Sequence, residues 1–330
     1  METKMRYGQV TGVAKPVSIL VQGTVYFNES NVDEAFALFD AVFAHGCNTF
    51  DTAHVYGAGA CERVLGRWIA SRGVRDEVVI LDKGAHPYNG KKRVTPEDIT
   101  SDISDSLERL GVDFIDLYVL HRDDETQPVE PIVDILNQHH REGRIGAFGG
   151  SNWSYERVQA ANRYAEMHSL IPFAVSSPQF SLPEMVQPAW EGCISLGGTR
   201  NQTARAWYAS ARLALFTWSS LAGGFMTGKY QRHNLNNPGD YFDGVTIHAY
   251  AYEDNFRRIE RAQTMATDKN LSLPQLGLAY VLSQPLPIFA LVGARTPDEF
   301  VENLPALDIR LSAAEMAWLN LETDTLSSTI

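Results

Sequence analysis

Four polar residues stand at the predicted ends of buried strands, and their types suit proton transfer to a carbonyl oxygen. Asp51, Lys83 and His121 end three such strands, and Tyr56 follows shortly after Asp51. Reduction of a carbonyl needs a proton donor beside the oxygen that becomes an alkoxide. A phenol has a pKa of about 10, so an ammonium beside Tyr56 would favour its phenolate and a carboxylate would hold that ammonium in place. Loss of Lys83 or Asp51 is therefore expected to raise the pKa of Tyr56.

Each of these four residues taken alone has an ordinary structural explanation, such as capping a turn, packing in a loop or bonding inside the core. Taken together they predict a catalytic group in which Tyr56 is the acid, Lys83 and Asp51 tune it, and His121 orients the substrate oxygen. No side chain can supply a hydride, so this chemistry implies a nicotinamide cofactor.

The elements that must position these residues are short apolar strands alternating with stretches of helical period, which is typical of a parallel sheet covered on both faces. The predicted strands lie near Val17–Val21, Asn48–Asp51, Val78–Lys83, Ile115–Leu120, Ile145–Ser151, Phe173–Ser177, Ala214–Trp218 and Ile288–Val292. Eight such units and no linker predict an α/β fold, a single (β/α)8 TIM barrel domain over residues 1–330. The carboxyl ends of its strands share one rim, where active sites of such barrels lie.

Helix starts are predicted at Thr95, Thr296 and Ser312, each followed three residues later by an acid. The two longest irregular stretches, Ser181–Ala204 and Ser219–Ala251, follow the sixth and seventh strands. Long loops in compact domains usually serve function, so these stretches are expected to wall the pocket.

Composition narrows the class of protein. The chain has 330 residues, 44% of them hydrophobic and 21% charged, and a formal net charge of −12. This charge, without any basic cluster, argues against a nucleic-acid or membrane partner. Cys47, Cys61 and Cys193 form neither a disulfide framework nor a zinc motif. With no signal peptide read at the start, a cytoplasmic protein is expected.

The segment Gly46–Ala53 with Tyr56 and Gly57 resembles the first signature of the aldo-keto reductase superfamily. The resemblance continues through Glu62, Leu65–Gly66, Lys83–Gly84, Ser106–Leu110 and Asp113–His121, and covers nearly the whole chain. It implies that Asp51, Tyr56, Lys83 and His121 are the catalytic tetrad.

The resemblance also implies cofactor contacts in the last four units of the barrel. They are Ser151, Asn152, Gln179, Trp218, Ser219, Leu221, Gly224, Lys229, Gly293, Arg295, Glu299, Glu302 and Asn303. Arg295 would hold the 2′-phosphate of NADPH, while Glu299, where many relatives carry Gln, is expected to reach back to the amide of Thr296. NADPH is therefore the expected cofactor, with NADH as the alternative. Asp82 and Ser220 are further departures from the family pattern.

The expected substrate is a small aldehyde, ketone or sugar-like carbonyl, with Tyr26, Phe27, His54, Tyr88 and Trp153 as candidate pocket residues. Two other functions stay open. Trp218–Tyr230 is especially similar to potassium-channel β-subunits, which suggests a cofactor-sensing regulatory protein, and a metal-dependent barrel hydrolase or isomerase would need a ligand cluster that the sequence does not show. The natural substrate and the oligomeric state cannot be read from the sequence.

Overall fold

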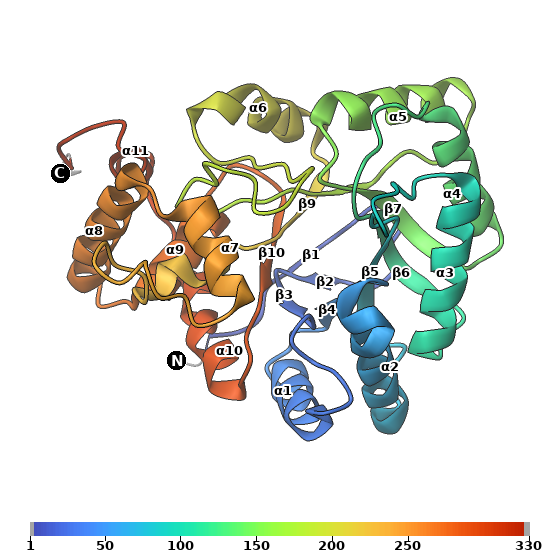
Figure 1. Cartoon of the computed structure of the whole chain (residues 1–330), viewed down its shortest axis with the longest axis horizontal. Coiled ribbons are helices and arrows are strands. Elements are labelled where there is room, and N and C mark those ends of the chain that lie inside the picture. The colour runs from blue at the N-terminus through green and yellow to red at the C-terminus, as the bar shows by residue number, and fades with distance from the viewer. Residues whose placement is uncertain (1–2, 327–330) are drawn as a thin grey trace.

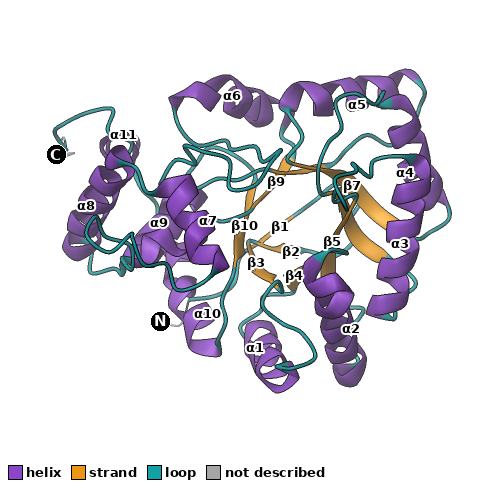
Figure 2. Ribbon diagram, viewed as in Figure 1, coloured by secondary structure: helices purple, strands orange, loops and turns teal. Residues whose placement is uncertain are grey.

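A closed barrel of eight parallel strands forms the centre of the computed structural model, which describes residues 3–326 (Figures 1 and 2). The strands are β3 (Leu20–Gly23), β4 (Thr49–Asp51), β5 (Val79–Gly84), β6 (Ile115–Leu120), β7 (Ile145–Ser151), β8 (Val175–Ser177), β9 (Ala214–Thr217) and β10 (Ile288–Val292). They pair in chain order, and β10 closes the ring against β3. The predicted (β/α)8 TIM barrel is confirmed.

Burial on both faces explains why the strands read as continuous apolar runs. One buried cluster fills the barrel, with Val21, Leu81, Leu117 and Phe216 among its members. A second, larger cluster lies between the strands and the surrounding helices. Because neither face meets water, polar residues are displaced to the strand ends.

The predicted first strand, Val17–Val21, is divided in the structure. Strand β2 (Val17–Ser18) pairs antiparallel with β1 (Tyr7–Gly8), and only from Leu20 does the chain enter the barrel as β3. The division falls at Ile19, whose amide donates to the carbonyl of Arg6 at 2.8 Å. Long-range pairing with the N-terminal segment therefore sets this boundary.

Helices surround the barrel on the outside (Figure 2). They are α1 (Val32–Ala44), α2 (Ala60–Arg72), α3 (Pro96–Leu110), α4 (Glu130–Arg141), α5 (Tyr155–Met167), α6 (Gln202–Ala211), α7 (Tyr241–Tyr250), α8 (Glu253–Asp268), α9 (Leu273–Leu282), α10 (Pro297–Asn303) and α11 (Ala313–Leu319). The predicted caps are confirmed, because the side chains of Thr95, Thr296 and Ser312 each accept from the backbone amide three residues on. In the part of the chain described, no helix has both the length and the apolar character needed to cross a bilayer.

The two long stretches after β8 and β9 are less irregular than expected. The first ends in the 3-10 turn η2 (Thr199–Asn201) and the start of α6, and the second contains η3 (Ala222–Thr227) and all of α7. Helix α7 is not predicted from the sequence, because Gly244 and its β-branched neighbours disfavour a helix. Contacts hold it instead: Asp240 accepts from the amide of Asp243 at 2.9 Å, and Thr246 donates to the carbonyl of Gly223 at 3.0 Å.

Candidate active site

The four residues predicted to be catalytic meet at the carboxyl end of the barrel. Lys83 Nζ lies 2.5 Å from Asp51 Oδ1 and 3.4 Å from Tyr56 Oη, and it also donates to the carbonyl of Thr52 at 2.8 Å. The rings of Tyr56 and His121 meet edge to face with centroids 5.7 Å apart. Asp51 ends β4, Lys83 lies near the end of β5, His121 follows β6, and Tyr56 begins the 3-10 turn η1 (Tyr56–Gly59).

The ion pair at the centre of this group is buried, with side-chain exposures of 3% for Lys83 and 5% for Asp51. Burial alone would lower the pKa of Lys83, but the charges of Asp51 and Tyr56 outweigh it and leave that pKa raised. Burial also raises the pKa of Asp51, against the opposing effect of Lys83. Lys83 is therefore a permanent cation at neutral pH.

Tyr56 does not become a stronger acid overall. Burial of its hydroxyl raises the pKa of Tyr56, Lys83 lowers it again in part, and Asp51 raises it. The phenol is therefore protonated at neutral pH, as a proton donor must be. The balance also corrects one expectation: Asp51 acts on Tyr56 against Lys83, so loss of the carboxylate alone favours the phenolate.

His121 is held neutral. Burial lowers the pKa of His121 well below its ordinary value, and Lys83, Arg122 and His86 add to this effect. Its Nδ1 is buried without a hydrogen-bond partner among the described residues. A neutral imidazole offers one N–H donor and one acceptor, so His121 can orient a carbonyl oxygen without competing with Tyr56 as the acid.

A connected polar network lies on the neighbouring strand ends. Asn152 Oδ1 accepts from the indole of Trp218 at 3.2 Å, and its Nδ2 donates to Ser151 Oγ at 3.1 Å and to the carbonyl of His121 at 3.3 Å. The amide of Gln179 bonds Ser181 at 2.7 Å and Ser195 at 2.6 Å. These predicted cofactor residues are thus brought to the same rim as the tetrad.

The segment after β9 places a second predicted group beside this rim. Ser219 and Gly224 have positive φ angles of 50° and 91°, and a Cβ on Gly224 would meet nothing within 4 Å. Leu221 is half-buried. Lys229 is exposed and bonds Asp243 at the start of α7, with Nζ 2.6 Å from Oδ1. This pair ties α7 to the segment.

The third predicted group surrounds the start of α10. The guanidinium of Arg295 stacks on Tyr26, 4.0 Å from the ring centroid. Glu299 Oε2 accepts from the backbone amide of Arg295 at 2.7 Å, not from that of Thr296 as expected. The side chain of Thr296 accepts from the amide of Glu299 at 3.3 Å, so one bond of the expected capping box is present, while the carboxylate of Glu299 bonds the amide one residue earlier.

The remaining members of this group have separate settings. Gly293 and Glu302 are exposed, and Asn303 is buried and donates to the carbonyl of Glu299 at 2.8 Å. The three groups together offer what a dinucleotide needs: amide and hydroxyl groups and an indole near the tetrad, a glycine segment with open space at Gly224, and an arginine fork in the turn after β10. The donor set fits a nicotinamide dinucleotide.

The predicted pocket residues divide. Tyr26 is half-buried against Phe242, with centroids 5.6 Å apart, and Tyr88 is 67% exposed. Phe27 and Trp153 lie in the core, exposed by only 2% and 1%. The structure does not bring these last two into an open pocket, because Phe27 packs on Phe39 and Trp153 on Phe173.

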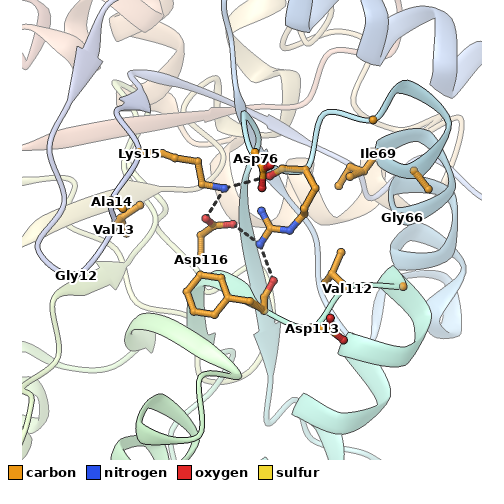
Figure 3. A pocket seen from close by; sticks show the side chains of 15 residues that line it. Gly12, Val13, Ala14, Lys15, Gly66, Ile69, Asp76, Val112, Asp113 and Asp116 are labelled. Atoms are coloured by element: carbon orange, nitrogen blue, oxygen red, sulfur yellow. Dashed lines mark hydrogen bonds and ion pairs between the residues drawn. The ribbon is translucent and has the colours of Figure 1, made fainter.

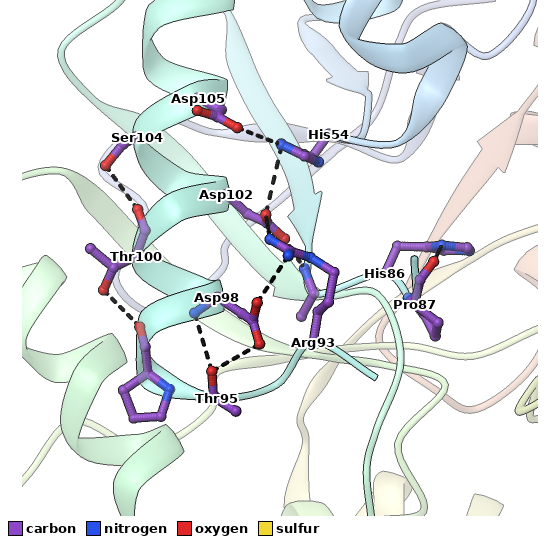
Figure 4. A network of polar contacts seen from close by, with 12 residues as sticks. His54, His86, Pro87, Arg93, Thr95, Asp98, Thr100, Asp102, Ser104 and Asp105 are labelled. Carbon is purple, nitrogen blue, oxygen red and sulfur yellow. Dashed lines mark hydrogen bonds and ion pairs between the residues drawn. The ribbon is translucent and has the colours of Figure 1, made fainter. Parts of the chain in front are cut away.

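His54 is also directed away from the tetrad. Its Nε2 lies 3.0 Å from Asp105 Oδ2 and 3.7 Å from Asp102 Oδ1, both on α3 (Figure 4). Arg93 bonds the same helix through Asp98, at 2.9 Å, and Asp102. His54 therefore belongs to a network outside the barrel.

Sequence reasoning missed three residues at the rim. Trp190 lies tilted against Trp218 with centroids 6.1 Å apart and donates to the hydroxyl of Tyr241 at 2.9 Å. His86 lies 5.0 Å from His121 between ring centroids. Arg122 immediately follows His121. The position of Arg122 directly after His121 could have identified it from the sequence, whereas the position of Trp190 depends on the fold of its loop.

A cavity of about 610 Å³ lies at the opposite, amino-terminal end of the barrel (Figure 3). Its two cations, Lys15 and Arg75, both pair with the buried Asp116, at 2.7 Å and 2.9 Å. Because Asp116 is the second residue of β6 and His121 follows its last, this cavity is separated from the tetrad by nearly the length of that strand.

Comparisons with known proteins agree with this geometry. The Aldo/keto reductase family matches residues 20–320. A probable voltage-gated potassium channel subunit beta from Oryza sativa is 30% identical over 319 residues, covering 92% of each chain. Norsolorinic acid reductase B from Aspergillus parasiticus is 30% identical over 88% of this chain and 74% of its own. An aldo-keto reductase of Schizosaccharomyces pombe whose name specifies NADP(+) is 29% identical over 83% and 79%. The chain therefore belongs to the aldo/keto reductase family, whose members are oxidoreductases acting on carbonyl compounds.

Proposed function

We propose that this protein is an NADPH-dependent reductase that converts an aldehyde, ketone or sugar-like carbonyl to the alcohol, with Tyr56 as the general acid. The observation that carries the proposal is the contact of Lys83 Nζ with both Asp51 and Tyr56, at 2.5 Å and 3.4 Å. We take the barrel as one functional unit over residues 1–330, in a reducing cytoplasmic setting that suits its free cysteines.

In this mechanism His121 and Tyr56 bind the carbonyl oxygen of the substrate. A reduced nicotinamide cofactor, when bound, would supply the hydride that this chemistry needs. Tyr56 gives its phenolic proton to the oxygen, so hydride and proton together produce the alcohol. Lys83 stabilises the phenolate left on Tyr56, and Asp51 holds Lys83 in position.

The cofactor would be held by the three groups already described. Ser151, Asn152 and Gln179 would bind the carboxamide, and Trp218 would stack on the ring. Ser219, Leu221, Gly224 and Lys229 would contact the pyrophosphate. Arg295 would hold the 2′-phosphate, with Gly293, Glu299, Glu302 and Asn303 around the adenosine. The engagement of the Glu299 carboxylate by a backbone amide supports NADPH over NADH, because a bonded carboxylate repels a phosphate less.

The proposal is tested by Tyr56→Phe, which removes only the ionisable hydroxyl. We expect kcat to fall about 100- to 10,000-fold while NADPH binding, followed by quenching of tryptophan fluorescence, stays near that of the unmutated protein. Tyr252→Phe, which removes a hydroxyl bonded to the exposed backbone of α7, is the control. Turnover close to that of the unmutated protein in Tyr56→Phe contradicts the assignment.

A cofactor-sensing regulatory protein is the second candidate, favoured by the similarity to a relative named as a potassium channel subunit. Slow turnover together with slow NADPH release would support it. Many turnovers per minute on simple aldehydes, with rapid exchange of the cofactor, would favour the enzyme.

A further inference from the structure

Arg122 is a buried cation without a carboxylate partner. Lys83, Arg122 and Arg258 are the buried cationic side chains within residues 3–326. Lys83 pairs with Asp51 and Arg258 pairs with Glu184. Arg122, which is 8% exposed, has no carboxylate of the described chain within ion-pair distance. Buried charges in proteins are almost always paired. We therefore expect a bound anion to be the partner of this arginine.

The guanidinium of Arg122 is held in place but is not saturated. Its Nε donates to the carbonyl of Glu191 at 3.2 Å and its Nη1 to that of His121 at 2.8 Å. These bonds use two of the five N–H donors of an arginine. Nη2 donates to no described residue, and it is not one of the side-chain atoms that are fully buried without a hydrogen-bond partner. One edge of a positioned fork therefore stays open.

The guanidinium of Arg122 lies at the same strand end as the reacting groups. Arg122 directly follows His121 at the carboxyl end of β6, and its carbonyl accepts from the buried indole of Trp153 at 3.2 Å, which fixes its backbone. Its charge contributes to lowering the pKa of His121 and of His86 and opposes the rise in the pKa of Tyr56. Its hydrogen bonds to the carbonyls of His121 and Glu191 hold the guanidinium at the strand end that carries His121, beside the place where the substrate must bind.

We infer that Arg122 binds a carboxylate on the substrate, so that the protein reduces compounds carrying both a carbonyl and a carboxylate. The inference deepens the proposed function and rests on it. An arginine fork matches a carboxylate in two parallel hydrogen bonds. Lys83 cannot take this role, because Asp51 already engages it. In a chain of net charge −12, an unpaired cation at the rim also selects for an anionic substrate locally.

The experiment compares acids with their uncharged esters. The probes are 2-, 3- and 4-carboxybenzaldehyde and succinic semialdehyde, each beside its methyl ester, with NADPH in excess. We expect the unmutated protein to favour at least one acid over its ester by about 10- to 100-fold in kcat/KM, which is the range of a charge-assisted hydrogen bond. Arg122→Met should bring this ratio close to one, and Arg122→Lys should keep part of it.

Arg157→Met is the matched control, because Arg157 stacks on Trp153 nearby but is already paired with Asp123 at 2.8 Å. It should keep the ratio of the unmutated protein. An acid-to-ester ratio near one for every pair overturns the inference, as does an equal ratio in Arg122→Met and the unmutated protein.

Binding separates this inference from the proposed function. Calorimetric titration with benzoate and with benzamide, in the presence of NADPH, reads the anion site without turnover. Benzoate should bind more tightly than benzamide to the unmutated protein and lose that advantage in Arg122→Met. If the protein reduces none of the carbonyl compounds, the proposed function is overturned. If it reduces esters and acids equally well, only the role of Arg122 is overturned. A loss of NADPH affinity in Arg122→Met as large as the loss for benzoate would assign Arg122 to the cofactor and overturn the inference.

Discussion

At the scale of single residues, the environment of each side chain decides its chemistry. Tyr56 and His121 are both titratable, yet burial pushes their pKa values in opposite directions, up for the phenol and down for the imidazole. At neutral pH both are therefore uncharged. Lys83 is the cation between them and the solvent-excluded carboxylate of Asp51.

Lys83 and Asp51 have opposite effects on the pKa of Tyr56, so the direction of the pKa shift in each variant is a test. In the proposed mechanism reduction requires protonated Tyr56, so kcat/KM should fall as pH rises through the pKa of Tyr56. Lys83→Met removes the charge that favours the phenolate, so the alkaline limb should move to higher pH while the rate falls. Asp51→Asn removes a charge that disfavours the phenolate, so the limb should move to lower pH. Profiles of kcat/KM against pH measure both, and shifts in the same direction would contradict the arrangement.

At the scale of elements, the junction of β10 and α10 determines how Arg295 is presented. Its backbone amide donates to the carboxylate of Glu299, its side chain lies on the face of Tyr26, and Tyr26 in turn contacts Phe242 of α7. The stack holds the guanidinium on the ring of Tyr26, away from the carboxylate of Glu299 that the backbone engages. The helix start therefore engages the acidic residue and leaves the basic one available.

Arg295→Ala tests this reading of the junction. We expect NADPH to bind about 10- to 100-fold more weakly and NADH to bind almost unchanged, since only the 2′-phosphate contact is lost. Fluorescence titrations with both cofactors measure the effect. Arg63→Ala, which removes an exposed arginine paired with Glu29 at 2.7 Å, is the control. Equal losses for the two cofactors would show that Arg295 does not distinguish them.

At the scale of the whole molecule, closure of the barrel requires close backbone approach between β7 and β8. A Cβ on Gly149 would lie 1.8 Å from the carbonyl oxygen of Val175. Gly149 lies on β7, the strand that ends at Ser151 and leads into Asn152, so closure and the proposed cofactor site depend on the same contact.

Gly149→Ala is therefore expected to lower the free energy of unfolding by at least about 3 kcal/mol, because the clash is with backbone that cannot move without opening the barrel. Gly244→Ala in α7 is the matched control, since a Cβ there meets nothing within 4 Å. It should raise the free energy of unfolding by about 0.5–1 kcal/mol. Urea denaturation measures both, and equal stability of the two variants would contradict this account of closure.

The sequence by itself determined the barrel and most of its strand ends, and it predicted which four residues form the tetrad. Apolar runs, helical periods and caps such as Thr95 and Ser312 are local signals, and a parallel sheet converts them into one rim. The residue types at that rim then predicted acid catalysis beside a nicotinamide. None of this needed a long-range contact to be known.

The tertiary structure alone decided the rest, because it depends on groups distant in the chain. Pairing of β1 with β2 divides the first predicted strand. Contacts with η3 stabilise α7 although its local sequence disfavours a helix. His54 pairs with Asp102 and Asp105 of α3 and not with the tetrad. Burial set the net pKa of Tyr56, and only the completed fold shows that Arg122 is enclosed without a carboxylate. Solvent exclusion and charge pairing are properties of the assembled barrel, so no local pattern carries them.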